Sequence, residues 1–436
     1  MSANTTQQQA SSQAHAEQDA VEYEMETYTH GLDFERPALT FQADKWEQLA
    51  CARMSADSKG YVYGSAGTRE TTSKNRAAFK KWSIVPNRLV TYSDGQTLPD
   101  MTSCILGENL ATAPIAMAPV GVLGIFNPEG EVAAARAAAQ EGIPYILSTA
   151  SSTSIEDVAT ANGPDGQRWY QLYWPSRAHD DVTISLLDRA QKSGFTVLFV
   201  TLDTYMLGWR PEDMDNGYNP FLRADRTGVQ IGLTDPVFRH KFYQRHGVQV
   251  EDKVETAAPE WMRTIFPGTS HSWDDVAFLK NHWKGPIVLK GIQTINDARK
   301  SVEVGVQGIV VSNHGGRQVD GGNSALGMLP HIVDALGGTE NKSMTVFYDS
   351  GIQSGADIAK ALALGADCVL VGRPYVYGLA LGGEKGVKHV LKSLVGELEL
   401  TLHLSGIKGV GKQWLNRACL VREDALFENV KGIGLH

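Results

Sequence analysis

The sequence predicts an α/β fold, a closed (β/α)8 TIM barrel with an N-terminal helical extension and a long lid insertion after the fourth strand. Three observations predict it. From Ala113 onward, a short apolar run, a polar loop and an Ala-rich helical segment follow one another repeatedly. Eight apolar runs occur in this alternation, which is typical of a closed parallel barrel. No GxGxxG motif follows the first run, which disfavours the alternative, a doubly wound open sheet that binds a dinucleotide.

The chain divides into three predicted parts. Residues 1–28 are expected to be a disordered tail, because they are rich in Gln, Ser, Ala and Thr and contain too few large apolar side chains to offset the entropy of ordering. Residues 29–112 are expected to form the N-terminal helical extension, and residues 113–436 the barrel. The chain has 436 residues, of which 42% are hydrophobic, and this is ample for one large core.

Within the extension, residues 41–79 show the apolar spacing of helices. One predicted apolar face comprises Trp46, Leu49, Ala50 and Met54. The same stretch contains Tyr61-Val-Tyr-Gly-Ser-Ala-Gly67, in which two tyrosines stand beside small residues. Composition alone is compatible with simple packing of these tyrosines and with a role in binding.

The barrel strands are predicted from the apolar runs between polar loops. The eight predicted strands are 114–119, 144–148, 168–173, 196–201, 286–290, 308–312, 345–349 and 368–372. Between about residues 210 and 270 the alternation stops, and the chain is polar, aromatic and interrupted by prolines. An insertion at the carboxyl end of the fourth strand is expected to lie over the barrel mouth as a lid.

Composition excludes several classes of protein. The formal net charge of −9 disfavours a nucleic-acid partner. The four cysteines are scattered and form no CxxC pair, so neither a metal site nor a secreted disulfide framework is expected. No apolar run reaches the roughly 18 residues of a membrane span, and no signal-peptide pattern opens the chain. A reduced, cytoplasmic protein without a membrane partner is the expectation.

Chemistry concentrates at the end of the predicted strand 308–312, where the chain reads Ser312-Asn-His-Gly-Gly-Arg-Gln318. A histidine alone at such a place is more often structural, and an arginine alone is usually a solvated charge. Here His314 and Arg317 are three residues apart in a Gly-Gly turn, so both can reach one small acidic ligand. Arginine holds a carboxylate through two parallel hydrogen bonds, and histidine moves protons near neutral pH.

The segment Ser312-Asn-His-Gly-Gly-Arg-Gln318 resembles the active-site signature of the FMN-dependent L-2-hydroxy acid oxidases and dehydrogenases. The resemblance covers the chain from about Phe41 to the end. It implies FMN as cofactor, a small 2-hydroxy acid as substrate, O2 as electron acceptor and a homo-oligomer, either a tetramer or an octamer. A haem-domain dehydrogenase is disfavoured, because no His-Pro-Gly-Gly motif precedes the barrel.

The resemblance also implies roles for single residues. His314, Asp203 and Lys290 are the catalytic set, in which Asp203 orients the imidazole and Lys290 balances negative charge on the flavin. The Asp–His pair has an independent rationale, because an acceptor behind the ring fixes its tautomer. A lysine after a buried run likewise needs a partner for its charge. The implied substrate-binding residues are Tyr61 (with Tyr63 as the alternative), Tyr173, Arg210, His314 and Arg317.

The cofactor-binding residues that the resemblance implies lie at the strand ends. They are Pro119, Val120, Gly121, Ser148, Gln171, Thr201, Lys290, Ser312, Asp349, Ser350, Gly351, Gln353, Gly372 and Arg373. Phosphate binding by the loops after the last two strands is a recurrent feature of such barrels. Gln353 departs from the family pattern, which usually has Arg there, so FMN is expected to be held less tightly.

The outcome of the reaction is predicted from Gly121 and the segment around it, Ala118-Pro-Val-Gly-Val-Leu-Gly124. Gly121 stands where many relatives have Ala, and is expected to leave room between flavin and substrate, which resembles the lactate 2-monooxygenase branch. The alternative is that Gly121 only relieves local strain. Ala150 stands where plant glycolate oxidases have a bulky aromatic residue, and is expected to widen the pocket. L-Lactate oxidation to acetate and CO2 is favoured over release of pyruvate and H2O2. Another FMN barrel enzyme and a non-catalytic scaffold are the remote alternatives.

Overall fold

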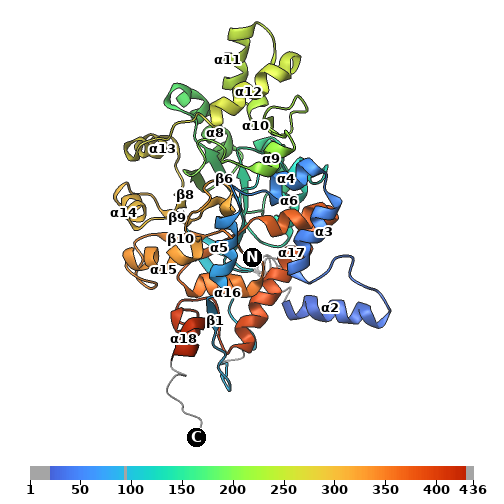
Figure 1. Cartoon of the computed structure of the whole chain (residues 1–436), viewed down its shortest axis with the longest axis vertical. Helices are drawn as coiled ribbons and strands as arrows, with labels where there is room; N and C mark the ends of the chain where they lie inside the picture. The colour runs from blue at the N-terminus through green and yellow to red at the C-terminus, as the bar shows by residue number, and fades with distance from the viewer. Residues whose placement is uncertain (1–19, 93–95, 429–436) are drawn as a thin grey trace, which may run out of the picture.

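The computed structural model describes residues 20–92 and 96–428 (Figure 1). Its centre is a closed barrel of eight strands in the order β10-β11-β4-β5-β6-β7-β8-β9, and every neighbouring pair is parallel. The strands are β4 (Ile115–Met117), β5 (Tyr145–Ser148), β6 (Arg168–Tyr173), β7 (Leu198–Thr201), β8 (Ile287–Ile292), β9 (Gly308–Val311), β10 (Thr345–Tyr348) and β11 (Cys368–Val371). The predicted fold class and all eight predicted strands are confirmed.

Helices follow the strands and surround the barrel (Figure 1). They are α6 (Gly130–Gln140), α7 (Ile155–Asn162), α8 (Asp180–Lys192), α13 (Val276–His282), α14 (Ile295–Glu303), α15 (Ala325–Ala335), α16 (Gly355–Ala363) and α17 (Arg373–Leu404). Four of them begin at a Ser or Thr whose side chain accepts a hydrogen bond from a backbone N–H of the first turn. These local signals place each helix start soon after the strand that precedes it.

The barrel is open at one end only. Its interior is filled by Trp169, Phe199 and Phe347, whose rings contact one another with centroids 5.2–6.0 Å apart. A hairpin of β2 (Ser103–Ile105) and β3 (Glu108–Leu110) adds Ile105 and Leu110 to this cluster. This packing fills the barrel interior, so a ligand site that opens into the barrel lies at the opposite, carboxyl ends of the strands.

The N-terminal extension consists of four described helices. They are α2 (Ala20–Leu32), α3 (Ala43–Arg53), α4 (Ala56–Tyr63) and α5 (Glu70–Phe79). Strand β1 (Trp82–Ile84) then pairs with β12 (Leu420–Arg422), just before α18 (Glu423–Glu428), and so ties the extension to the last part of the barrel. The helices predicted within 41–79 are confirmed.

Two details of the extension differ from expectation. The predicted disordered tail is wrong for residues 20–28, which belong to α2, because α2 packs along α17 and Tyr23 Oη lies 2.9 Å from His389 Nδ1. Residues 1–19 lie outside the described residues. Leu49 was expected on the apolar face but is 43% exposed. The buried stripe of α3 is narrow and contains Trp46 and Ala50 but not Leu49.

The insertion after β7 is a helical unit rather than a loop. It contains α9 (Pro211–Asp215), α10 (Gln230–Leu233), α11 (Pro236–His246) and α12 (Val254–Ile265). Phe238, Phe242 and Trp261 form a small core between α11 and α12. α11 packs against the barrel helix α8, so the bulk of the unit projects from the end of the molecule (Figure 1). Only some residues of the insertion, described below, reach the mouth of the barrel, and a role as a lid stays a prediction.

A buried carboxylate fastens this unit to the barrel. Asp235 accepts hydrogen bonds from the backbone N–H groups of Val237 and Phe238 at the start of α11. Its other oxygen accepts one from Ser185 Oγ at 2.7 Å and lies 3.3 Å from the Arg189 guanidinium of α8. Asp235 is fully buried, so its removal leaves the start of α11 without its cap and leaves Arg189 with Glu156 as its remaining ion-pair partner.

We expect Asp235→Ala to cost the insertion about 2–4 kcal/mol of local stability, since it removes an N-cap and the buried acceptor of Ser185 and Arg189 together. Hydrogen exchange measures this as faster exchange of the α11 amides. The control, Asp188→Ala, removes a half-exposed carboxylate paired with Lys192 and is expected to change exchange by less than about 1 kcal/mol. Equal effects of the two substitutions would contradict the assignment.

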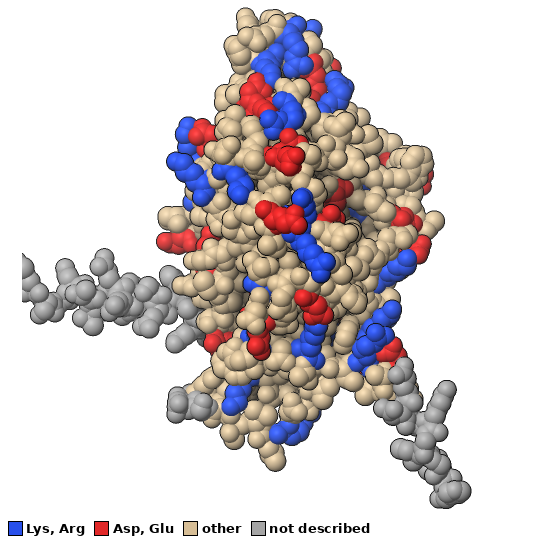
Figure 2. All heavy atoms as spheres, turned by 90° about the vertical axis from the view of Figure 1, so that its left-hand side faces the viewer, with Lys and Arg blue, Asp and Glu red and all other residues tan. Residues whose placement is uncertain are grey.

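Surface charge is mixed on the face that Figure 2 shows. Basic and acidic side chains alternate there, including around the helical unit at the top. Such interspersed charge is typical of a solvated surface and forms no single-sign stripe for a polyanion on that face. Across residues 20–92 and 96–428, no helix combines the length and the apolarity that crossing a bilayer requires.

Candidate active site

A deep pocket lies at the carboxyl ends of the strands, between the barrel, the extension and the insertion. The sequence-predicted residues that line it are Tyr61, Pro119, Val120, Gly121, Tyr173, Arg210, Lys290, His314, Arg317, Asp349, Ser350, Gly351, Gln353, Gly372 and Arg373. The alternative Tyr63 lines it as well. The remaining predicted residues, Ser148, Gln171, Thr201, Asp203 and Ser312, lie at the strand ends behind this lining and bond to it or to one another. The predicted convergence of distant segments on one pocket is therefore present.

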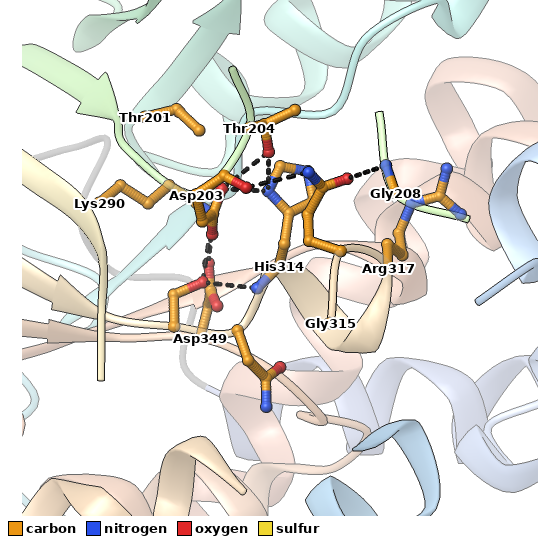
Figure 3. Close-up of polar contacts among 12 residues, drawn as sticks. Thr201, Asp203, Thr204, Gly208, Lys290, His314, Gly315, Arg317 and Asp349 are labelled. Carbon is orange, nitrogen blue, oxygen red and sulfur yellow. Dashed lines mark hydrogen bonds and ion pairs between the residues drawn. The ribbon is translucent and has the colours of Figure 1, made fainter. Parts of the chain in front are cut away.

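His314 is held from behind by a carboxylate (Figure 3). Its Nδ1 lies 2.9 Å from Asp203 Oδ1 and 3.2 Å from Thr204 Oγ1. His314 has a φ of 57° and is followed by Gly315 and Gly316 with φ of 65° and 77°, a tight turn that turns the ring toward the pocket. Because Nδ1 is engaged, Nε2 is the ring nitrogen left for a ligand.

Burial sets the protonation of this pair. Burial lowers the pKa of His314 below its usual range, although Asp203 opposes the effect. Burial alone would raise the pKa of Asp203, but the charges of His314 and Lys290 outweigh it and hold that pKa well below its usual range. At neutral pH the pair is thus a neutral imidazole on an ionised carboxylate, which is the state of a general base.

Two guanidinium groups lie beside the imidazole. Arg317 donates from Nη1 to the backbone oxygen of Gly64 at 2.7 Å, and its guanidinium carbon is 5.1 Å from the Tyr61 ring centroid. Arg210 is buried and donates to the backbone oxygen of Arg317 at 3.1 Å and to Gln318 Oε1 at 2.7 Å.

Burial, reinforced by Arg317, lowers the pKa of Arg210 to about 10, so it stays charged at neutral pH. Among the described residues, no carboxylate lies within ion-pair distance of Arg210 or Arg317. The two cations therefore leave room for the carboxylate of a ligand. Tyr61 is buried, which raises its pKa and keeps its hydroxyl a neutral donor.

Lys290 supplies a further buried cation. Its Nζ lies 3.4 Å from Asp349 Oδ2 and 3.2 Å from Ser312 Oγ. Burial alone would lower the pKa of Lys290, but Asp349 and Asp203 outweigh it and raise the pKa, so the ammonium is charged. Lys290 also stands opposite Thr201 in the sheet register.

From Lys290 a row of polar groups continues along neighbouring strand ends. Gln171 Nε2 donates to Thr201 Oγ1 at 2.9 Å, and Ser148 Oγ donates to Gln171 Oε1 at 2.9 Å. All three side chains are buried. A buried row of amide, hydroxyl and ammonium groups matches the polar edge of a planar heterocycle.

A second part of the pocket, which we call the anion end, suits an anion, and its Arg373 shares the Gly64 oxygen with Arg317. Glycines 351 and 372 leave backbone groups accessible there, and Arg373 donates to the backbone oxygens of Val62 and Gly315 at 2.9 and 3.0 Å. Burial lowers the pKa of Arg373, which has no carboxylate partner among residues 20–92 and 96–428. A cation enclosed without a counter-ion favours a bound phosphate.

Sequence reasoning missed several lining residues. Arg76 of α5 borders the anion end and donates to Asp357 Oδ2 at 2.7 Å and to the Gly351 oxygen. Phe221 and Phe266 come from within the insertion and reach the substrate end. The Asn75-Arg76 pair was a visible signal, because it lies on the helical extension beside the tyrosines, whereas no local pattern marks either phenylalanine.

The expectation that Gly121 leaves room for a ligand is wrong, whereas the expectation for Ala150 stays a prediction. A Cβ built on Gly121 would lie 2.6 Å from the Ala150 side chain and 2.7 Å from its backbone oxygen. The space of the missing side chain is thus occupied by Ala150, which is itself buried and outside the pocket lining. Glycine is needed here for close approach of two backbones, and it does not open additional space for a ligand.

A family model described as FMN-dependent dehydrogenase matches residues 50–420. The chain belongs to this family. It is 58% identical over 93% of its length to an FMN-dependent alpha-hydroxy acid dehydrogenase of Schizosaccharomyces pombe, 97% of which is covered. It is 39% identical over 87% of its length to an L-lactate oxidase of Lysinibacillus sphaericus, 92% of which is covered. A crystal structure of mandelate oxidase superposes on it with a TM-score of 0.72 at 32% sequence identity. The match covers 86% of this chain and 96% of the mandelate oxidase chain.

FMN is the cofactor of this family and of this chain, and the residues present fit it. The polar row with Lys290 would hold the ring, and the glycines with Arg373 would hold the phosphate. Asp349, which pairs with Lys290, would accept hydrogen bonds from the ribityl chain. In the described part of the chain, no group of three or more His, Cys, Asp or Glu side chains could hold a metal ion.

Gln353 lines the anion end, and its backbone N–H donates to Asp357 Oδ2 at 3.0 Å. We expect Gln353→Arg to lower the Kd of FMN about tenfold, because it adds one charge-assisted hydrogen bond to the phosphate. Fluorescence titration of the apoprotein with FMN measures it. Gln413→Arg adds the same charge at an exposed residue outside the pocket lining and is expected to leave the Kd unchanged. An unchanged or higher Kd for Gln353→Arg would reject the prediction.

Proposed function

We propose that this chain oxidises a small L-2-hydroxy acid, foremost L-lactate, with O2 as the final electron acceptor. The observation that carries the proposal is the arrangement of His314 and two guanidinium groups in one pocket. His314 is backed by Asp203, and Arg210 and Arg317 have no carboxylate partner among the described residues. A proton acceptor beside a carboxylate-sized cationic site is what a 2-hydroxy acid requires.

In the proposed reaction, Arg317, Arg210 and Tyr61 bind the substrate carboxylate. His314 Nε2 takes the proton from the hydroxyl or the α-carbon, and Asp203 stabilises the imidazolium that forms. Bound FMN supplies the two-electron acceptor. Lys290 places a fixed positive charge at the polar row, where it stabilises the negative charge that develops during reduction.

An aromatic wall supports a substrate with a short side chain. Tyr173 lies against Phe266 with ring centroids 4.9 Å apart, and Phe266 lies against Phe221 at 5.2 Å. All three line the same pocket as His314 and Arg317. Two of these rings come from the insertion, which thereby encloses the substrate end. A methyl group fits such an enclosure more readily than a long chain.

For the outcome we propose the lactate 2-monooxygenase reaction, in which pyruvate stays enclosed together with the H2O2 formed from O2. The H2O2 then oxidises the pyruvate, which loses CO2, so that acetate, CO2 and water leave. Enclosure by the aromatic wall supports it. The second candidate is an L-lactate oxidase that releases pyruvate and H2O2, which the 39% identity to a protein of that name favours. Product analysis after turnover of L-lactate in air separates the two candidates. A flavin that L-lactate does not bleach in anaerobic stopped flow would reject both, in favour of another FMN reaction or a scaffold.

We also propose that the protein is a cytoplasmic homo-oligomer, a tetramer or an octamer. Light scattering of the purified holoenzyme measures its mass in solution, and a monomeric mass would reject the oligomer. A fluorescent fusion reports the compartment.

A further inference from the structure

A hydroxyl group completes the pair of His314 and Asp203. Thr204 follows Asp203 directly and is only 2% exposed. Its Oγ1 donates to Asp203 Oδ1 at 2.8 Å and lies 3.2 Å from His314 Nδ1 (Figure 3). Because the hydroxyl donates its one proton to Asp203, only its lone pairs remain to face Nδ1. This arrangement requires the proton of the neutral imidazole to be on Nδ1.

Asp203 has few alternatives to this arrangement. Its Oδ2 is buried and has no hydrogen-bond partner within the described residues, so both of its donors act on Oδ1. Asp203 also lies against Gly291, where an added Cβ would be 2.8 Å from the Asp203 Cβ. The backbone of β8 therefore restricts the movement of the carboxylate, and the Thr204 hydroxyl is its only donor besides His314 in this part of the chain.

Behind this group lies a second cavity, which we call the rear cavity. Thr201, Thr204, Tyr205, Gly291 and His271 are among its lining residues. Tyr205 is 47% exposed, so the rear cavity reaches the surface. Thr204 lies between the rear cavity and Asp203, whose side chain is 10% exposed. A fixed hydroxyl, rather than exchanging water, therefore serves as the second donor to the carboxylate.

We propose that Thr204 is a positioning residue, whose hydroxyl fixes Nδ1 as the protonated nitrogen of His314 and limits how strongly Asp203 attracts that proton. This inference rests on the proposed role of His314 as the base. A carboxylate with two donors is a weaker acceptor than one with a single donor. The imidazolium is then less favoured, and the ring stays neutral and ready to take the substrate proton.

Other groups around His314 do not titrate near neutral pH. Lys290 and Arg210 face it as fixed cations, and Arg317 lies on its own segment. Burial raises the pKa of Tyr61 and Tyr173 above their usual range. An inflection near neutral pH in the rate of flavin reduction therefore reports His314.

The test compares the pH dependence of flavin reduction by L-lactate in the wild type and in variants of Thr204. Burial lowers the pKa of His314, so the wild-type rate is expected to rise through an inflection below about pH 6.5 and then to be constant. Thr204→Val has nearly the same shape and no hydroxyl. Its inflection is expected about one pH unit higher, which makes reduction about tenfold slower on the acidic side. Thr204→Ser keeps the hydroxyl and is expected to keep the wild-type profile.

Thr204→Ala is the second variant without a hydroxyl. Its smaller side chain admits water from the rear cavity, and so its inflection is expected to move in the same direction as that of Thr204→Val but less. It also serves if Thr204→Val does not fold. A profile unchanged in both variants, or a shift in Thr204→Ser as large as in Thr204→Val, would overturn the inference. A wild type that L-lactate does not reduce would instead overturn the proposed function.

Discussion

His314→Ala is expected to bind FMN and to remain yellow, yet to be reduced by L-lactate at least about 10³-fold more slowly than the wild type. The residues that would hold the flavin, among them Lys290 and Gln171, do not depend on the imidazole for their hydrogen bonds. The substitution removes the proton acceptor. No other side chain that lines the pocket is aligned by Asp203 and could replace it. Anaerobic stopped-flow absorbance of the flavin measures the rate.

The control is His331→Ala, which removes an exposed histidine of α15 and is expected to be reduced at the wild-type rate. Normal reduction of His314→Ala would remove His314 from its proposed role. Loss of the flavin itself would show that the imidazole is needed for the structure of the cofactor site, which is also contrary to expectation.

Arg317→Leu is expected to lower kcat/KM for L-lactate by about 10²–10³-fold, the cost of losing one partner of an enclosed charge pair. Arg317 lies over Tyr61 and next to buried Arg210, so the carboxylate would have to be held by Arg210 alone. Arg317→Lys keeps the charge but loses the planar pair of donors, and an intermediate loss is expected. Steady-state kinetics with L-lactate and with uncharged lactamide separates a loss of carboxylate binding from a general loss of activity. Only the kcat/KM for L-lactate is expected to fall.

Arg299→Leu is the matched control, because Arg299 is exposed on α14. It is expected to leave kcat/KM unchanged. If the ratio of kcat/KM for L-lactate to kcat/KM for lactamide were the same in Arg317→Leu as in the wild type, Arg317 would not bind the carboxylate.

The barrel and most of the site were predictable because their signals are local. A buried parallel strand is a short apolar run, so Gly308–Val311 is recognisable without any knowledge of its neighbours. The carboxyl ends of parallel strands meet at one rim, which brings Lys290, His314 and Asp349 together once the strands are assigned. The motif around His314 then gave the chemistry.

The insertion and the small residues were less predictable. In the insertion, the core residues Phe238 and Trp261 are separated by turns, and the apolar residues between them show no regular spacing. The helical unit and its attachment through Asp235 were therefore not apparent from the sequence. Gly121 was interpreted from its position alone, whereas its effect depends on Ala150, a residue on another strand end. Contacts of this kind depend on the distance between two backbones.

The order of the strands, the polar residues at their ends and the His314–Arg317 pair were determined by the sequence alone, because apolar periodicity and turn chemistry act over a few neighbouring residues. Only the tertiary structure decided that Thr204 shares Asp203 with His314, that Ala150 fills the space beside Gly121, and that two phenylalanines of the insertion enclose the substrate end. These contacts join residues far apart in the chain or side chains in particular rotamers, and their geometry is set by packing of the whole molecule.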